Sequence, residues 1–215
     1  MSYDITELIT FFRQDMSDET TPYLWSDLEI VRYLAEAQDE FMLRTKYAAE
    51  TLSLSYTAGA EYVEVPYYIS KVRTAYDALN RSLDLMDKQD WENLNQGPAW
   101  RARTGAVTTL ITDLQSKQYR LYPIPEEDGS LYLDTYRTAK QEVGIAQGLE
   151  VTDPPAQRTI LLGARAIAYG KQDADVFEPK AEAQLRMQFE IETQNYFYRV
   201  QGSRRYSRPV SYGGI

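Results

Sequence analysis

The fold is decided by the stretch WSDLEIVRYLAEAQDEFMLRT (residues 25–45) and by TLSLSYTAGAEYVEVP (residues 51–66), which follows it. In the first stretch, Ser26 and Glu29 have the S-x-x-E spacing of a capping box, and apolar residues then recur with a helical period, which predicts a long helix. The second stretch alternates apolar and polar residues and turns at 58–60, which predicts a β-hairpin. A helical region therefore gives way to a β-region between them.

Helical patterns stand on both sides of the β-region. The segment ITELITFFRQDM (residues 5–16) predicts a short helix with one apolar face. Further along the chain, Asp153 is the expected N-cap of a helix with Pro154 or Pro155 in its first turn. A last long helix is expected from Pro179 to about Arg199. Small residues in the helix after Asp153 predict that another helix approaches it closely: Gly163, Ala164, Ala166 and Ala168.

The β-region is expected to continue to about residue 140. The sequence predicts further strands at 67–77, 105–113, 118–125 and 129–139, with a turn at Asp128-Gly129 and a short helix near 87–94. The order of helices, strands and helices predicts an α+β fold, in which N- and C-terminal helices form one bundle. The expected parts are N-terminal helices (1–50), an inserted antiparallel β-module (51–140), C-terminal helices (141–199) and an extended basic C-terminal arm (200–215).

Composition excludes several kinds of site. The 215 residues include neither Cys nor His, which rules out disulfides, Ser-His-Asp and Cys-His catalysis, and His- or Cys-ligated metals. We therefore expect a protein that is not an enzyme and holds no cofactor or metal. The formal net charge of −9 argues against tight nucleic-acid binding but allows passing contact with DNA. No apolar run is long enough for a membrane span and the first residues do not read as a secretory signal, so we expect an intracellular protein without membrane contact.

Three motifs resemble a phosphate-binding loop, a calcium loop and a glycan-hydrolase site, but the residues of each motif argue against that function. GARAIAYGK (163–171) lacks the spacing and the Ser or Thr of a phosphate-binding loop, and Asp173-Ala174-Asp175 lacks the remaining ligands of a calcium loop. Four carboxylates surround Trp91 and would suit glycan hydrolysis, although solvated surface is the favoured interpretation: Asp84, Asp87, Asp90 and Glu92. Trp25, Trp91 and Trp100 are expected to fill small cores rather than to bind ligands.

The C-terminal segment RVQGSRRYSRPVSYGGI (residues 199–215) contrasts with the rest of the chain. It holds four arginines and no carboxylate, so its formal charge is +4. Because the net charge of the whole chain is −9, residues 1–198 have a formal charge of about −13. Arg and Tyr dominate interface hot spots, which favours a docking arm over an unimportant terminus. Its candidate binding residues are Arg199, Arg204, Arg205, Tyr206, Arg208 and Tyr212. The 18 tyrosines of the chain suit either subunit interfaces or a sheet core.

Three long phrases together resemble the head-to-tail adaptor proteins of short-tailed bacteriophages, also called tail tubular protein A or head-completion proteins. They are SDETTPYLWSDLEIVRYLAEAQDEF (17–41), WRARTGAVTTLITDLQSKQYRLYPIPEEDGSLYLDTYR (100–137) and AYGKQDADVFEPKAEAQLRMQFE (168–190). The resemblance implies a structural connector in the neck of the virion, a dodecameric ring between the phage portal protein and the tail nozzle protein, with genome DNA passing through.

The same resemblance gives the basic arm a role. In this family a C-terminal extension docks on the portal, so residues 200–215 would find carboxylates on the portal or on a neighbouring adaptor. The β-module would face the tail nozzle and the helices would pack beside their neighbours. Some adaptors of this kind are credited with cell-wall hydrolysis, so a carboxylate-dependent peptidoglycan hydrolase is the alternative function.

Overall fold

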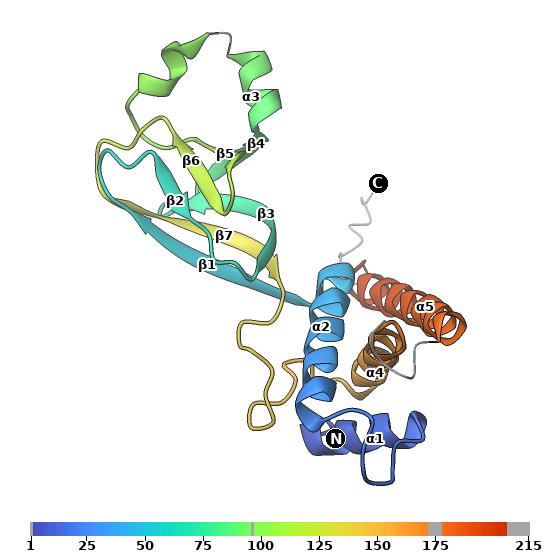
Figure 1. Cartoon of the computed structure of the whole chain (residues 1–215). Coiled ribbons are helices and arrows are strands. Elements are labelled where there is room, and N and C mark those ends of the chain that lie inside the picture. Colours follow the sequence, from blue (N-terminus) through green and yellow to red (C-terminus); the bar gives the residue numbers. More distant parts are fainter. Residues whose placement is uncertain (1, 96, 172–177, 206–215) are drawn as a thin grey trace, which may run out of the picture. The chain divides into compact units, whose positions relative to one another are not determined.

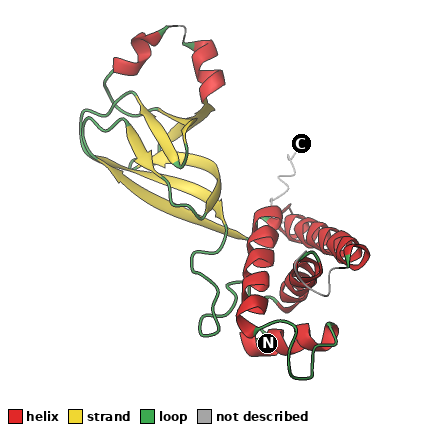
Figure 2. Ribbon diagram, viewed as in Figure 1, coloured by secondary structure: helices red, strands yellow, loops and turns green. Residues whose placement is uncertain are grey.

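The computed structural model describes residues 2–95, 97–171 and 178–205, which divide into two compact units. The helical unit comprises described residues of 1–47 and 138–215, and the β-unit comprises 48–137 (Figures 1 and 2). The mixed α+β class predicted from the sequence is confirmed. The expected limits of the β-module, residues 51 and 140, each differ by three residues from those of the β-unit.

The helical unit contains the helices whose starts the sequence marks most clearly. They are α1 (Ile5–Asp15), α2 (Asp27–Thr45), α4 (Pro154–Tyr169) and α5 (Pro179–Arg205). Ser26 and Glu29 form the predicted capping box of α2, and Asp4 and Glu7 form a second one on α1 that the sequence analysis missed. Asp153 stands at the N-cap of α4 as predicted, although its side chain accepts no hydrogen bond from the first backbone N–H groups of the helix.

Helix α4 packs against both α2 and α5, and α1 packs against α2 and α4. Gly163 makes the close approach possible, because a Cβ atom there would lie 2.9 Å from the Phe189 ring of α5 and 3.0 Å from Ala37 of α2. The small-residue prediction is therefore confirmed at Gly163. Phe12, Phe41 and Phe189 are the largest fully buried side chains of this unit.

Helix α5 is longer than the sequence suggested. It continues to Arg205, six residues past the expected end at Arg199, so residues 200–205 are helical and not extended. The physical reason is that no proline stands between residues 200 and 205, and the single Gly202 only weakens a helix without ending it.

The β-unit holds one seven-stranded sheet in the order β1-β7-β3-β4-β5-β6-β2. Its strands are β1 (Ala48–Tyr56), β2 (Tyr62–Glu64), β3 (Ile69–Asp77), β4 (Ser82–Asp87), β5 (Thr109–Gln115), β6 (Gln118–Tyr122) and β7 (Gly129–Arg137). The predicted short helix is present as α3 (Lys88–Leu94), and a 3-10 helix, η1 (Pro98–Ala102), follows it. Strand β4 was not predicted from the sequence.

Two pairings differ from the expected antiparallel module. Strands β4 and β5 pair in parallel, because α3, η1 and their loops (88–108) form a connection long enough for a crossover. The predicted hairpin of β1 with β2 is wrong: β1 pairs along its whole length with β7, and β2 pairs with β6. The loop between β1 and β2 is instead bonded to the β6–β7 loop, since Asp128 accepts from the Ala58 N–H at 2.8 Å.

The tryptophans lie in cores, as predicted. In the β-unit, Trp91 and Trp100 pack edge to face at 5.8 Å, in a cluster with Ile111 and Tyr122 that is separate from the main core of the sheet. In the helical unit, Trp25 is buried with its ring edge-on to Phe12. All three rings are therefore unavailable as ligand platforms.

Candidate functional site

The predicted arm residues begin on the last turns of α5. The Arg199 guanidinium lies 3.7 Å from the Asp153 carboxylate and 4.8 Å from the centre of the Tyr196 ring. Burial, together with the negative charge of Asp153, raises the pKa of Tyr196 to about 12. Arg199 therefore makes a contact within the helical unit, through a side chain that is 60% exposed.

The other arm residues are described less completely. Arg204 and Arg205 form the C-terminal end of α5, a position where the helix dipole favours positive charge. Tyr206, Arg208 and Tyr212 lie outside the described residues, as do the carboxylates of Asp173 and Asp175.

The carboxylates near Trp91 serve local structure. Asp87 caps α3, since its Oδ1 accepts from the Asp90 N–H at 2.7 Å, and Glu92 lies 3.5 Å from Arg101. A shallow depression of about 440 Å³ beside them has only polar and charged walls: Asp87, Lys88, Gln89, Glu92 and Asn93. A general acid for glycan cleavage needs a carboxyl group whose surroundings raise its pKa, and a sugar needs a ring to stack on. With Trp91 buried, this depression offers no stacking ring.

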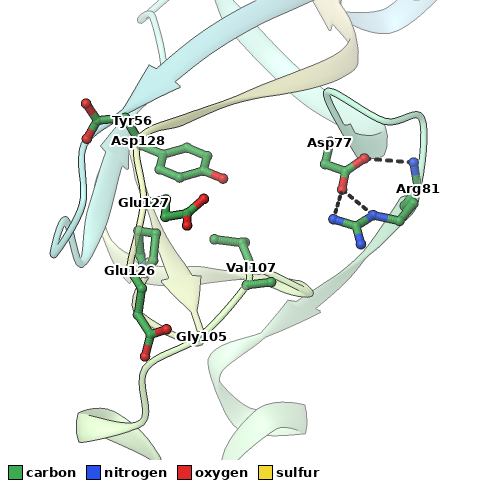
Figure 3. A pocket seen from close by; sticks show the side chains of 10 residues that line it. Tyr56, Asp77, Arg81, Gly105, Val107, Glu126, Glu127 and Asp128 are labelled. Atoms are coloured by element: carbon green, nitrogen blue, oxygen red, sulfur yellow. Dashed lines mark hydrogen bonds and ion pairs between the residues drawn. The ribbon is translucent and has the colours of Figure 1, made fainter.

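A second concave surface, of about 340 Å³, lies in the β-unit between the start of β4 and the β6–β7 loop (Figure 3). The Asp77 carboxylate in this surface accepts hydrogen bonds from the backbone N–H and the guanidinium of Arg81 and from the backbone N–H of Leu79. These bonds lower the pKa of Asp77, and the bond from the Arg81 backbone has the largest effect. Glu126 accepts from the Thr104 hydroxyl at 2.7 Å. These carboxylates hold turns together.

Chemistry that needs a metal or a phosphate loop finds no support in the described part of the chain. No group of three or more Asp or Glu residues there is placed to hold a metal ion. The segment 163–169 of the rejected phosphate-loop motif is helical, within α4, as its composition predicted. Among the described helices, none combines the length and apolarity that a membrane span requires.

Helix α5 carries an exposed apolar stripe that was not predicted from the sequence. Met187, Ile191 and Tyr198 are 64%, 46% and 61% exposed, on the side of the helix away from the buried Phe189. Their spacing of four and seven residues was the available signal. A second stripe on the same helix, through Leu185 and Phe189, has the same spacing of four residues and is buried.

A comparison with curated proteins gave no match. Residues 3–213 match the family described as SU10 adaptor protein, which covers both units and nearly the whole chain. The chain therefore belongs to the SU10 adaptor family, a family of phage head-to-tail adaptors.

Proposed function

We propose that the protein is a structural connector of a phage virion, in which a ring of copies joins the portal to the tail nozzle and lets genome DNA pass. The observation that carries the proposal is the family match over residues 3–213. The charge of −9 supports it, because an acidic channel wall repels the DNA phosphates and keeps the duplex from sticking. By family analogy the ring has twelve copies and the β-unit faces the nozzle.

The basic C-terminal segment is the proposed portal contact. Helix α5 supports this, since Arg204 and Arg205 are the last two residues of the helix. Arginine suits such a contact because its planar guanidinium pairs with a carboxylate through two hydrogen bonds. Arg208, Tyr206 and Tyr212 would extend the same contact to carboxylates of the portal or of a neighbouring adaptor.

The first test is the particle mass of the protein alone and mixed with the portal protein of its own phage. We expect a portal particle that carries a full ring of adaptors. A protein that stays monomeric in both samples would overturn the proposal. Comparing the two samples also distinguishes a ring that forms alone from one that needs the portal as a template.

The arm is tested by charge reversal. Replacing Arg204 and Arg205 by Glu should weaken portal binding more than replacing both by Ala, because repulsion adds to the lost pairing. The matched control is Lys71→Glu with Arg73→Glu on strand β3, which changes the net charge equally. Equal weakening by both pairs would show that overall charge, and not the arm, sets the affinity.

A further inference from the structure

Strand β1 forms a free edge of the sheet. It pairs with β7 along all nine of its residues, and within the described part of the chain no strand pairs with its other side (Figure 1). The Thr135 hydroxyl of β7 donates to the Glu50 carbonyl, so this carbonyl faces β7. Because neighbouring residues of a strand direct their backbone groups to opposite sides, Thr51, Ser53 and Ser55 direct their N–H and C=O groups away from the sheet.

This edge lacks the features that normally keep an edge strand from pairing. Edge strands are usually short, or they carry proline, lysine or a β-bulge. The other edge strand of the sheet, β2, follows this rule with three residues. Strand β1 has nine residues, contains neither proline nor lysine, and keeps an unbroken register with β7. Such an edge is suited to the addition of a strand from a partner.

The apolar side of β1 is also incompletely covered. Leu52, Leu54 and Tyr56 pack against the main core of the β-unit but remain partly exposed. A shallow hollow of about 620 Å³ lies beside the end of β1, between this strand and β2. The residues that line it include two carboxylates, Glu64 and Asp128, and no basic side chain. An added strand would cover the apolar side chains, and a basic residue on it would meet the two carboxylates.

Residues 206–215, YSRPVSYGGI, suit this edge by their sequence. They lie outside the described residues and follow the end of α5 at Arg205. Large side chains alternate there with small ones: Tyr206, Arg208, Val210 and Tyr212 with Ser207, Pro209, Ser211 and Gly213. This alternation is the period of a strand, and it gives one bulky face and one small face. Ten residues are enough to span the nine of β1, and the segment contains Arg208 but no Asp or Glu, which complements the acidic hollow.

Pro209 decides the direction of the added strand. Its nitrogen carries no hydrogen, so this residue must direct its backbone away from β1. In a parallel pair, a residue whose backbone points away lies opposite one whose backbone points toward it, and the two side chains lie on the same face. Pro209 and the other small residues would then share the exposed face of Ser53 and Ser55, and Val210 and the other large residues would cover the apolar side. An antiparallel strand with the same faces would need a donor at Pro209.

We propose that residues 206–215 of one copy add a parallel strand to the β1 edge of the next copy. This inference rests on the proposed ring and names the surface of the neighbouring subunit that receives the C-terminal segment. The edge and the segment are different parts of one chain, so the contact is head-to-tail, repeats from copy to copy and closes into a ring when the rotation allows. Arg204 and Arg205, at the end of α5, stay available to the portal.

Disulfide scanning tests the pairing in the assembled protein, because the chain has no native cysteine and a disulfide needs Cβ atoms about 4 Å apart. Ser207→Cys or Ser211→Cys is combined in one chain with a cysteine at position 51, 53 or 55 of β1, and the protein is oxidised. We expect a ladder of covalent multimers. In a parallel pair, the best partner of position 207 lies nearer the start of β1 than the best partner of position 211. The matched control is Ser82→Cys on the interior strand β4, which should give no ladder with either position.

The outcomes separate this contact from the ring itself. Wild-type rings with no ladder from any pair would overturn the contact and leave the proposed function standing. Cross-linked monomers without a ladder would show that the segment pairs with its own chain, and would overturn the contact with the next copy. A best partner that moves toward the start of β1 when the cysteine moves from 207 to 211 would overturn the parallel direction. Wild-type protein that assembles neither alone nor on the portal would overturn both the contact and the proposed function.

Discussion

Replacing Gly163 by alanine should destabilise the helical unit, although alanine is the better helix former. A Cβ atom at this position would lie 2.9 Å from Cε2 of Phe189 and 3.0 Å from Cβ of Ala37, well inside ordinary carbon–carbon contact. Phe189 is fully buried, so its ring has no free space into which to swing. Helices α4 and α5 must therefore move apart or the ring must leave its preferred rotamer.

The magnitude follows from two opposing effects. Alanine gains about 1 kcal/mol of helix propensity over glycine. Overpacking a well-packed core costs roughly 1–3 kcal/mol. We expect a net loss of about 1 kcal/mol in the free energy of unfolding, measured by urea denaturation followed by far-UV circular dichroism, which mainly reports the helices.

A double-mutant cycle identifies the cause. In a Phe189→Leu background the contacting ring atoms are gone, so Gly163→Ala should cost less there, with a coupling energy on the order of 1 kcal/mol. Gly170→Ala is the matched control, because the nearest atom to its added Cβ is Cγ of the flexible Glu182 side chain, at 3.3 Å. The reasoning is refuted if Gly163→Ala stabilises the protein, or if its cost is unchanged by Phe189→Leu.

Three further perturbations have expected outcomes. Arg13→Ala should cost about 3–5 kcal/mol in thermal unfolding, because it leaves the buried Asp18 carboxylate without the guanidinium 2.7 Å away, and a cost below 1 kcal/mol would contradict this. The hydrogen bond from Lys171 lowers the pKa of Glu29 to about 2 from its ordinary 4.5, so the stabilisation by Glu29 is complete above pH 4.5 and is lost as the pH falls toward 2. Glu29→Gln should flatten that part of the stability–pH profile, and an unchanged profile would refute the assignment. Trp100→Ala should destabilise the β-unit by about 3–5 kcal/mol in calorimetry, whereas a ligand platform would lose little.

Much of the chain's organisation could be predicted from short-range patterns. The capping box of α2 is set by Ser26 and Glu29, which are three residues apart, and the prolines that open α4 act on their own turn. The basic character of residues 199–215 is likewise a property of composition alone. Such features need no distant partner, so a sequence states them directly.

Features that depend on distant partners were decided only by the tertiary structure. A local turn at 58–60 suggested that β1 pairs with β2, yet β7 matches β1 along all nine residues from Ala48 to Tyr56 and β2 offers three. The contact of Arg199 with Asp153 and the groove between α1 and α4 likewise join residues far apart in the chain. Caps and helical periods are fixed by neighbours within a turn. A strand can pair with any of several segments that are distant in the chain. The pairing that forms is the one that buries the most apolar area and satisfies the most hydrogen bonds, and this can be seen only in the folded chain.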